Sequence, residues 1–203
     1  MIRFLTKEDI PEHQKLITTV WQETYKGIVN QTYLDKLTST EESRIELNKL
    51  NYNESQKDTL IIEENNKIIG FVRFGQTDEK EYKNTGEIFA LYILSKYQKK
   101  GYGLKLVKAV ISELLKQNYK NMIIGCISKN PSNQFYQHIG GKKVKERPFP
   151  KTGDNLIENI YYYEDIKRRT KVLRKEMLWM GNLQKCRSKC TGTGGVAWDW
   201  TNI

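Results

Sequence analysis

Apolar and polar residues follow two different periods along the chain, and the period separates helices from strands. In residues 10–25 and 102–117 the apolar side chains recur every three to four positions, which predicts two amphipathic helices. Shorter helices are expected over residues 31–37, 41–50 and 131–139. Three of these five helices precede the first long strand.

The strands are predicted from short apolar runs. Segments 58–64 and 67–75 are separated by an Asn-Asn turn, a pattern typical of a β-hairpin. Segment 86–94 is an almost continuous apolar run, which is typical of a strand buried on both faces at the centre of a sheet. Further strands are expected at residues 2–5, 121–127, 142–146 and 157–163.

These elements follow the order β-α-α-α-β-β-β-α-β-α-β-β. The order predicts one mixed α/β domain over residues 1–166, without internal repeats. We interpret the charged segment 76–85 as a solvated loop, the usual state of such a run. Residues 167–203 follow the last predicted strand and form a C-terminal extension.

The formal net charge of +10 would by itself suggest an anionic partner such as nucleic acid. The charge is concentrated at one end, because residues 167–203 contribute +7 and residues 1–166 only +3. We therefore interpret the extension as a basic, flexible or solubilising tail. A nucleic-acid-binding or ribosome-associated role is an alternative function, confined to this tail.

Composition excludes several classes of protein. Hydrophobic residues make up 38% of the chain, which is enough for a core and excludes wholesale disorder. No run approaches the roughly 18 apolar residues of a spanning helix, and no apolar signal segment is recognised, so we expect a cytoplasmic protein without membrane contact. Three cysteines are too few for a disulfide framework. Cys126 is expected to be inert in the core, and Cys186 and Cys190 are interpreted as ordinary thiols, so no metal site is predicted.

One turn has the composition of a phosphate-binding site. Residues 97–104, YQKKGYGL, lie between a buried strand and an amphipathic helix. Gly101 and Gly103 allow close approach of a ligand to the backbone, and the amide groups at the positive end of the helix would face a pyrophosphate beside Lys99 and Lys100. The alternative is a purely structural glycine turn. A P-loop and a complete dinucleotide fingerprint are excluded, because neither motif is present here.

At this point a family resemblance becomes specific. The run GEIFALYILSKYQKKGYG resembles the strand-turn-helix of GNAT N-acetyltransferases, with their motif Q/R-x-x-G-x-G/A. Residues 130–140, NPSNQFYQHIG, resemble a second family segment, N-x-x-x-x-x-F-Y-x-x-x-G. The resemblance covers about residues 1–166. It implies a GNAT fold: a mixed sheet of six to seven strands flanked by about four helices, with a splayed strand pair that holds acyl-CoA.

The resemblance implies acetyl-CoA as co-substrate and places residues around it. The pantetheine arm would pair with the edge of the strand at residues 91–93, where the Ile93 amide would polarise the acetyl carbonyl. The sequence departs from the family pattern at Gly141, where Phe is usual, and at Ser95-Lys96, where many members have Pro. The full implied cofactor set is Leu91, Tyr92, Ile93, Gln98, Lys99, Lys100, Gly101, Tyr102, Gly103, Leu104, Asn130, Asn133 and Tyr136.

Two residues are predicted to be catalytic. Tyr136 occupies the motif's Tyr position and would protonate the leaving thiolate; packing alone is the alternative. Glu87 stands where several members keep a carboxylate base. Strand alternation would place it on the same face as Ile93. The alternatives are a water chain as base and a strand-end carboxylate that is solvated or paired with a lysine.

The acceptor is predicted to be a primary amine that attacks the thioester directly. Trp21, Tyr25 and Tyr33 would bind it through their aromatic faces, although core packing explains Trp21 equally well. The acceptor would be a polyamine, an aminoglycoside-like amine, an amino acid or a peptide N-terminus. A non-catalytic acyl-CoA sensor is a further alternative. The oligomeric state stays open, a homodimer included.

Overall fold

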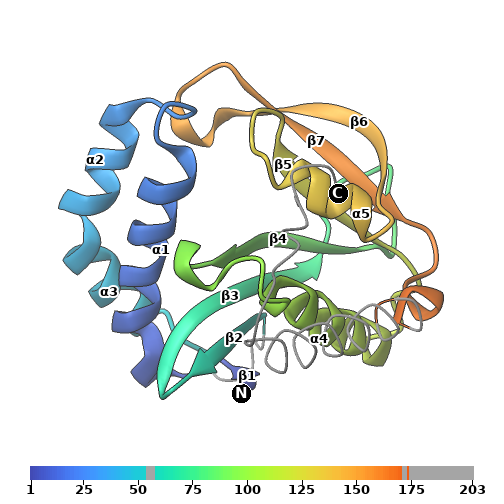
Figure 1. The fold of residues 1–203 in the computed structure, drawn as a ribbon, viewed down its shortest axis with the longest axis horizontal. Helices are drawn as coiled ribbons and strands as arrows, with labels where there is room; N and C mark the ends of the chain where they lie inside the picture. The colour runs from blue at the N-terminus through green and yellow to red at the C-terminus, as the bar shows by residue number, and fades with distance from the viewer. Residues whose placement is uncertain (54–57, 171–172, 174–203) are drawn as a thin grey trace, which may run out of the picture.

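The computed structural model of the chain describes residues 1–53, 58–170 and 173 (Figure 1). Most of the predicted extension 167–203, with Cys186 and Cys190, lies outside these described residues. The core nevertheless continues beyond residue 166. Ile166 and Leu173 are almost completely buried, and the Arg169 guanidinium donates a hydrogen bond to the carbonyl oxygen of Gly140 at 3.1 Å. The division at residue 166 stays a prediction.

Within the described residues, seven strands form one mixed sheet in the order β1-β2-β3-β4-β5-β7-β6. Neighbouring strands are antiparallel except β4 and β5, which are parallel. The predicted element order is confirmed, and β6 is longer than expected. The strands are β1 (Ile2–Phe4), β2 (Thr59–Glu64), β3 (Lys67–Gln76), β4 (Gly86–Ile93), β5 (Met122–Ile127), β6 (Lys142–Phe149) and β7 (Leu156–Tyr163).

Helices cover both faces of the sheet (Figure 1). The first three lie together on one face, and α4 packs against β2, β3 and β4 on the other. The short α5 lies beside β5 and β7. The α-helices of the described residues are α1 (Ile10–Tyr25), α2 (Gln31–Ser39), α3 (Glu41–Leu50), α4 (Tyr102–Lys116) and α5 (Asn133–His138), one more than the four that the resemblance implied.

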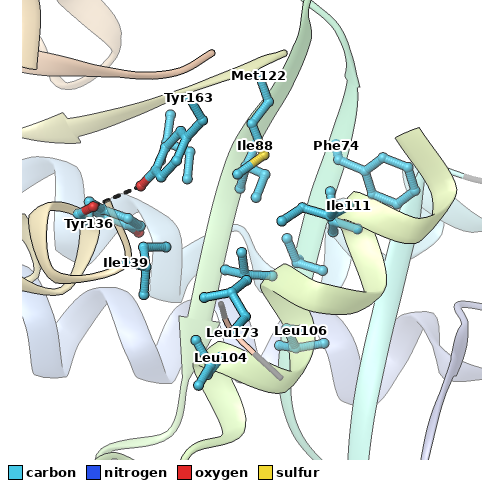
Figure 2. Packing of buried hydrophobic residues seen from close by; sticks show 14 of the residues in the cluster. Phe74, Ile88, Leu104, Leu106, Ile111, Met122, Tyr136, Ile139, Tyr163 and Leu173 are labelled. Atoms are coloured by element: carbon cyan, nitrogen blue, oxygen red, sulfur yellow. Dashed lines mark hydrogen bonds between the residues drawn. The ribbon is translucent and has the colours of Figure 1, made fainter. Parts of the chain in front are cut away.

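The apolar stripe of α4 explains its position. Leu106, Val110, Ile111 and Leu114 are completely buried, because helical spacing places them on one side, against the sheet. Figure 2 shows Leu106 and Ile111 packed among strand residues that include Ile88. Burying one such side chain contributes about 1.5 to 3 kcal/mol to the stability of the fold.

The core on the α1 face has a different composition. It contains aliphatic residues of α1, α2 and β2, together with an aromatic group from several elements. Trp21 and Tyr25 of α1 lie with ring centroids 4.6 Å apart, and Tyr33 and Tyr92 lie within 6.3 Å of Trp21. This face therefore places polar hydroxyl and indole groups beside the middle of the sheet.

Strand β4 differs from its prediction in its second half. Its first three residues, Gly86 to Ile88, are buried and pair with β3 and β5 on either side. Phe89 is 44% exposed and has no partner on β3, because Arg73 pairs with Ala90 and the next residue, Phe74, pairs with Ile88. Phe89 is thus a β-bulge. The pairing of β4 with β5 also ends at Ile88, so the two strands diverge there.

The charged loop between β3 and β4 is not merely solvated, which corrects the prediction for residues 76–85. Thr77 and Thr85 are buried, and Tyr82 stacks on Tyr162 of β7 with ring centroids 5.6 Å apart. Glu79 and Glu81 form ion pairs with cations of β6. The charged side chains of the loop therefore bind it to β6.

Candidate active site

The open edge of β4 presents backbone amides where a cofactor is expected. The Leu94 amide donates to the carbonyl oxygen of Ile69 on β3, and opposed residues of an antiparallel pair alternate between bonded and non-bonded. Gly70 and Ile93 are the next opposed pair. The alternation turns the N–H groups of Ile93 and Leu91 away from β3 and toward the gap between β4 and β5.

Tyr92 has a different environment from its two neighbours. It is opposed to Phe71, so the same alternation directs its backbone toward β3. Its side chain packs in the core of the α1 face, with its hydroxyl 3.1 Å from that of Tyr25. Burial raises the pKa of Tyr92 well above its usual range. The structure thus places the Tyr92 side chain with the predicted acceptor residues instead of on the open edge.

The turn before α4 has the geometry predicted for an anion site. Gly101 is the N-cap residue of α4 with φ of 80°, and Lys99 also has a positive φ of 56°. Within the described part of the chain, none of the backbone N–H groups of residues 99–104 donates a hydrogen bond. These groups lie at the positive end of a 15-residue helix, whose dipole favours an anion.

The side chains of the turn surround this free backbone. The ammonium groups of Lys96 and Lys100 lie 5.1 and 5.3 Å from the ring centroid of Tyr97. The side-chain amide of Gln98 donates to the carbonyl oxygen of Ile93 at 2.9 Å, which connects the turn to the open edge of β4. The hydroxyl of Tyr102 donates to Glu64.

The two predicted asparagines mainly fix the loop between β5 and α5. The side-chain oxygen of Asn130 accepts from the Ser132 amide at 2.8 Å. The side-chain amide of Asn133 donates to backbone carbonyls of the same loop, and its oxygen accepts from Asn159 and Tyr161 at 2.9 and 2.8 Å. Asn133 therefore positions the helix that carries Tyr136, and its polar atoms are already bonded.

Tyr136 is buried against the α4-side core, and its hydroxyl makes no hydrogen bond to the described residues. Its backbone carbonyl accepts from the hydroxyl of Tyr163 at 2.9 Å (Figure 2). Burial raises the pKa of its phenol well above the usual range. The phenol therefore keeps its proton at neutral pH, as a proton donor must.

Glu87 does not share a face with Ile93, which corrects the strand-alternation prediction. The extra residue at Phe89 reverses the alternation, so Ile88, Leu91 and Ile93 all pack in the α4-side core. Glu87 points to the α1 face with Ala90 and Tyr92.

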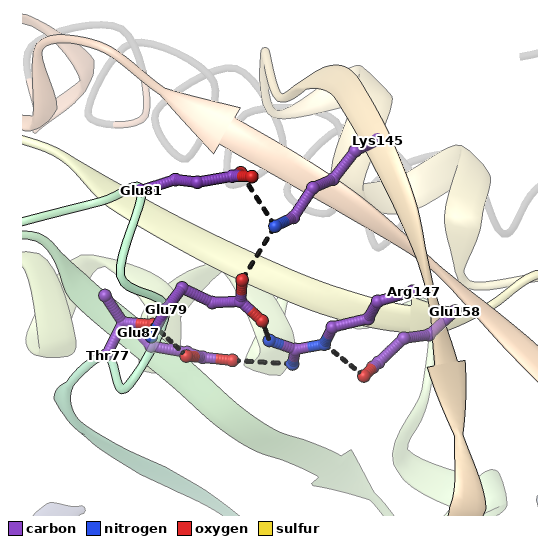
Figure 3. A network of polar contacts seen from close by, with 7 residues as sticks. All are labelled: Thr77, Glu79, Glu81, Glu87, Lys145, Arg147 and Glu158. Carbon is purple, nitrogen blue, oxygen red and sulfur yellow. Dashed lines mark hydrogen bonds and ion pairs between the residues drawn. The ribbon is translucent and has the colours of Figure 1, made fainter.

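The Glu87 carboxylate is already engaged on both oxygens (Figure 3). It accepts from the Thr77 hydroxyl at 2.6 Å and pairs with the Arg147 guanidinium at 2.9 Å. Its side chain is only 4% exposed. These contacts favour the structural alternative, with an arginine in place of the lysine that the sequence analysis considered.

Glu158 of β7 is an acidic residue that the sequence analysis missed. Its carboxylate lies 2.5 Å from Arg147, on the same guanidinium as Glu87 (Figure 3). Burial raises the pKa of Glu158 above its usual value, although Arg147 opposes the shift. The available signal was Gly125, a glycine inside the buried apolar strand β5, because glycine there can mark a close approach of another group.

A cation of the protein lies beside the aromatic residues of the α1 face. The Lys151 ammonium lies 5.3 Å from the ring centroid of Trp21, so it already covers one face of this predicted acceptor-binding residue. Burial lowers the pKa of Lys151. The loop that carries Lys151 is fixed to the segment after α1, because Asn30 donates to Thr152 at 2.6 Å and to Asp154 at 2.9 Å.

Cys126 is free and buried, and burial raises the pKa of its thiol to about 12. It is therefore inert, as expected. Over the described ranges there is no group of three or more His, Cys, Asp or Glu side chains that could hold a metal ion. Within the same residues, no helix combines the length and the apolar character needed to cross a membrane.

Comparison with known proteins gives a consistent result. The profile of the acetyltransferase (GNAT) family matches residues 20–140. The uncharacterized N-acetyltransferase YuaI of Bacillus subtilis (strain 168) is 29% identical over 166 residues, which cover 77% of this chain and 88% of YuaI. The range 20–140 that the family profile matches contains the turn before α4 and the segment around Tyr136, the two motifs on which the resemblance depended.

Two solved structures confirm the fold. PaiA N-acetyltransferase from Thermoplasma acidophilum, in complex with coenzyme A, has a TM-score of 0.64 at 20% identity and covers 81% of this chain and 98% of that chain. YncA from Salmonella typhimurium, with its cofactor acetyl-CoA, has a TM-score of 0.55 at 23% identity and covers 81% and 92%. Because the family profile matches more than half of its residues, the chain belongs to the acetyltransferase (GNAT) family, and the predicted enzyme class, an acyltransferase, is confirmed.

Proposed function

We propose that the protein transfers the acetyl group of acetyl-CoA to a primary amine by direct attack. The main support for this proposal is that two sets of backbone N–H groups without hydrogen-bond acceptors lie next to each other in the chain. The N–H groups of residues 99–104 face outward at the start of α4, and those of Leu91 and Ile93 face the gap beside β4. An extended ligand with a pyrophosphate at one end and amides along its arm fits both sets.

Acetyl-CoA supplies the activated thioester, and the chain positions it. The pyrophosphate would accept from the amides of residues 99–104, with Lys99 and Lys100 beside it. A pantetheine carbonyl would accept from the Leu91 amide. The Ile93 amide would then donate to the acetyl oxygen, where negative charge develops during attack.

The reaction needs proton transfers in both directions. An alkylammonium first loses one proton, because its pKa lies near 10.4 and only the neutral nitrogen has a free electron pair. That pair forms the C–N bond while the C=O electrons move to oxygen. The tetrahedral intermediate collapses, the C–S bond breaks and the thiolate takes the phenolic proton of Tyr136. The second nitrogen proton passes to water and water reprotonates Tyr136, so one proton is released in each turnover.

Tyr136 is supported as the acid by its free hydroxyl and by its being protonated at neutral pH. Glu87 remains a prediction as the base, and its bonds to Thr77 and Arg147 count against it. The acceptor would approach on the α1 face, beside Trp21 and Tyr25. Its expected class is a small-molecule amine or a peptide N-terminus.

Thiol release tests the proposal. Acetyl-CoA is incubated with the full chain and with spermidine, kanamycin, single amino acids or an N-terminally free peptide, and free thiol is measured. We expect thiol release that depends on one of these amines and an acetylated product of matching mass. Binding of acetyl-CoA without turnover for any amine would indicate the sensor alternative. Salt-dependent RNA binding that is lost on deletion of residues 174–203 would indicate the tail alternative.

A further inference from the structure

The geometry points to Glu158, and not Glu87, as the group that accepts the proton of the acceptor amine. The inference deepens the proposed function and rests on it. Glu158 lies on β7, at a position that no motif of the resemblance includes. Four observations support the assignment: its place beside the gap between β4 and β5, the glycine beneath it, its free carboxylate oxygen and the charges around it.

The place of Glu158 follows from the register of the sheet. Ile88 and Ile124 are the last opposed pair of β4 and β5, and Gly125 is the next residue of β5. The α-carbon of Gly125 points to the α1 face, since its neighbours Ile124 and Cys126 pack on the α4 side. The Glu158 carboxylate lies over this α-carbon. It therefore lies where the two strands begin to separate.

Gly125 makes room for this carboxylate. A side-chain carbon at position 125 would overlap an oxygen of Glu158 and would lie 3.1 Å from Arg147. No positive φ requires glycine there. The glycine interrupts an otherwise apolar strand, and the space it leaves is filled by the acid and its arginine. The sequence thus gives up side-chain packing at this position to hold a carboxylate.

Three acids pair with Arg147, namely Glu79, Glu87 and Glu158, and they differ in which carboxylate oxygens are free. Both oxygens of Glu87 have partners, one from Thr77 and one from Arg147. Oε1 of Glu158 accepts from Nε of Arg147 at 2.5 Å, whereas its Oε2 accepts no hydrogen bond from the described residues. A general base needs an oxygen that is free to accept a proton. Both oxygens of Glu79 are also paired, with Lys145 and Arg147, so within the described residues Glu158 alone of the three offers a free oxygen.

The surrounding charges suit an ammonium ion. Four carboxylates and two cations form the network, a formal charge of −2 beside the gap (Figure 3): Glu79, Glu81, Glu87 and Glu158 with Lys145 and Arg147. An excess of negative charge in a partly buried site attracts a cationic amine. Trp21 and Tyr25 would then contact the rest of the acceptor.

The groups that face Glu158 also adjust its basicity. Arg147 of β6 lowers its pKa, while burial, Glu87 of β4 and Glu79 of the loop before β4 raise it. Cys126 of β5 and Tyr25 of α1 also lie within electrostatic range. The net direction is upward, toward the working pH, where a carboxylate becomes a more effective base.

The step is a single proton transfer. The nitrogen of the bound R–NH₃⁺ gives one proton to Oε2 of Glu158, which leaves a neutral amine and a carboxylic acid. The amine then attacks the thioester as described above. The acid returns its proton to water after the product leaves, and the carboxylate again pairs with Arg147.

The test compares Glu158→Gln with Glu87→Gln, using the amine found active in the thiol-release assay. We expect Glu158→Gln to lower kcat about 100-fold at pH 7, and to recover as the pH rises and free amine accumulates. Glu87→Gln should lower kcat far less, and its pH profile should keep the wild-type shape but move to lower pH, because Glu87 raises the pKa of Glu158. Glu146→Gln is the matched control, because it removes a carboxylate of β6 that pairs with Lys143 outside this network, and it should change kcat less than threefold.

A second variant covers the case in which Glu158→Gln does not fold. Gly125→Ala displaces the far end of a flexible side chain, so the fold should persist and coenzyme A should bind normally, while kcat falls at least tenfold. A wild-type pH profile in Glu158→Gln, or wild-type kcat in Gly125→Ala, would overturn the inference alone. Absence of amine-dependent turnover in the wild type would overturn the proposed function, and this inference with it.

Discussion

The two halves of β4 have opposite environments within eight residues. Gly86 to Ile88 are buried and pair on both sides, whereas beyond the bulge at Phe89 the strand pairs only with β3. The first half fixes the sheet and the second presents unpaired backbone to a ligand. Stability and function are thus separated along one strand, and the single extra residue at Phe89 marks the boundary between them.

The largest effect on stability is expected in the closed half of β4, Gly86 to Ile88, which pairs on both sides; the open half is the part beyond Phe89. Ile88→Ala removes a side chain that is 1% exposed and leaves a cavity between β4 and α4, which should lower the free energy of unfolding by about 2 to 5 kcal/mol. Phe89→Ala is the control one residue along, because its side chain is 44% exposed and should cost much less. Denaturant unfolding of both variants measures the difference. Equal losses would contradict the division of the strand.

A pH-dependent effect is expected at His13, which packs edge-on against Phe71, the β3 partner of the open half, with ring centroids 4.4 Å apart. Burial lowers its pKa from 6.5 to about 4, and its Nε2 has no partner among the described residues. The unfolded chain therefore binds a proton more readily between these values, so stability is lost as the pH falls from about 7 to 4.

His13→Leu removes this titration. The stability of the variant relative to the wild type should rise by about 2 to 3 kcal/mol between pH 7.5 and pH 4.5, since one pKa unit corresponds to about 1.4 kcal/mol. Urea unfolding of both proteins at the two pH values gives this difference, in which other titrating groups cancel. A difference that does not depend on pH would show that folding does not lower the pKa of His13.

Tyr136 of α5 tests the chemistry proposed at the open half of β4. Tyr136→Phe should lower kcat about 100-fold and change the affinity for acetyl-CoA less than twofold. The phenol makes no hydrogen bond within the described residues, so the variant should unfold at the wild-type denaturant concentration. Tyr163→Phe is the matched control, because that hydroxyl donates only to the Tyr136 backbone at 2.9 Å. An unchanged kcat in Tyr136→Phe would assign the residue to packing.

The sequence was sufficient for the order of the elements, because apolar periodicity reports which side of an element is buried. It was not sufficient for the bulge at Phe89, since GEIFALYIL is apolar throughout and no position is marked as the extra one. That single residue reverses which side chains share a face, and so it overturned the predicted placement of Glu87 beside Ile93. Periodicity cannot detect a change of register that depends on the neighbouring strand.

The candidate site was predictable where a local motif forms it and not where the fold assembles it. The turn at residues 99–104 is contiguous, and Gly101 has the positive φ that a glycine in such a turn predicts. The group around Arg147 comes from β4, β6, β7 and a loop, and its members are ordinary acids in sequence. Gly125 is the one sequence signal of that assembly, because a glycine inside an apolar strand indicates close approach of another group. Which group approaches it is known only from the position of Glu158 in the structure.

The smallest effect tests the acceptor side of the open half. The Lys151 ammonium lies over Trp21 in the position that the resemblance implied for the acceptor's cation. Lys151→Met keeps an unbranched side chain of similar length but removes the charge, which frees the aromatic face for a cationic amine. We expect a twofold to fivefold lower KM for the amine and an unchanged KM for acetyl-CoA, measured by initial rates.

Lys100→Met is the matched control on the opposite side of the site. It should raise the KM for acetyl-CoA and leave the KM for the amine unchanged, because its ammonium belongs to the turn before α4. If Lys151→Met instead raises the amine KM, the lysine must contact an anionic group of the acceptor, and the substrate class would narrow from simple amines to amines that also carry a carboxylate.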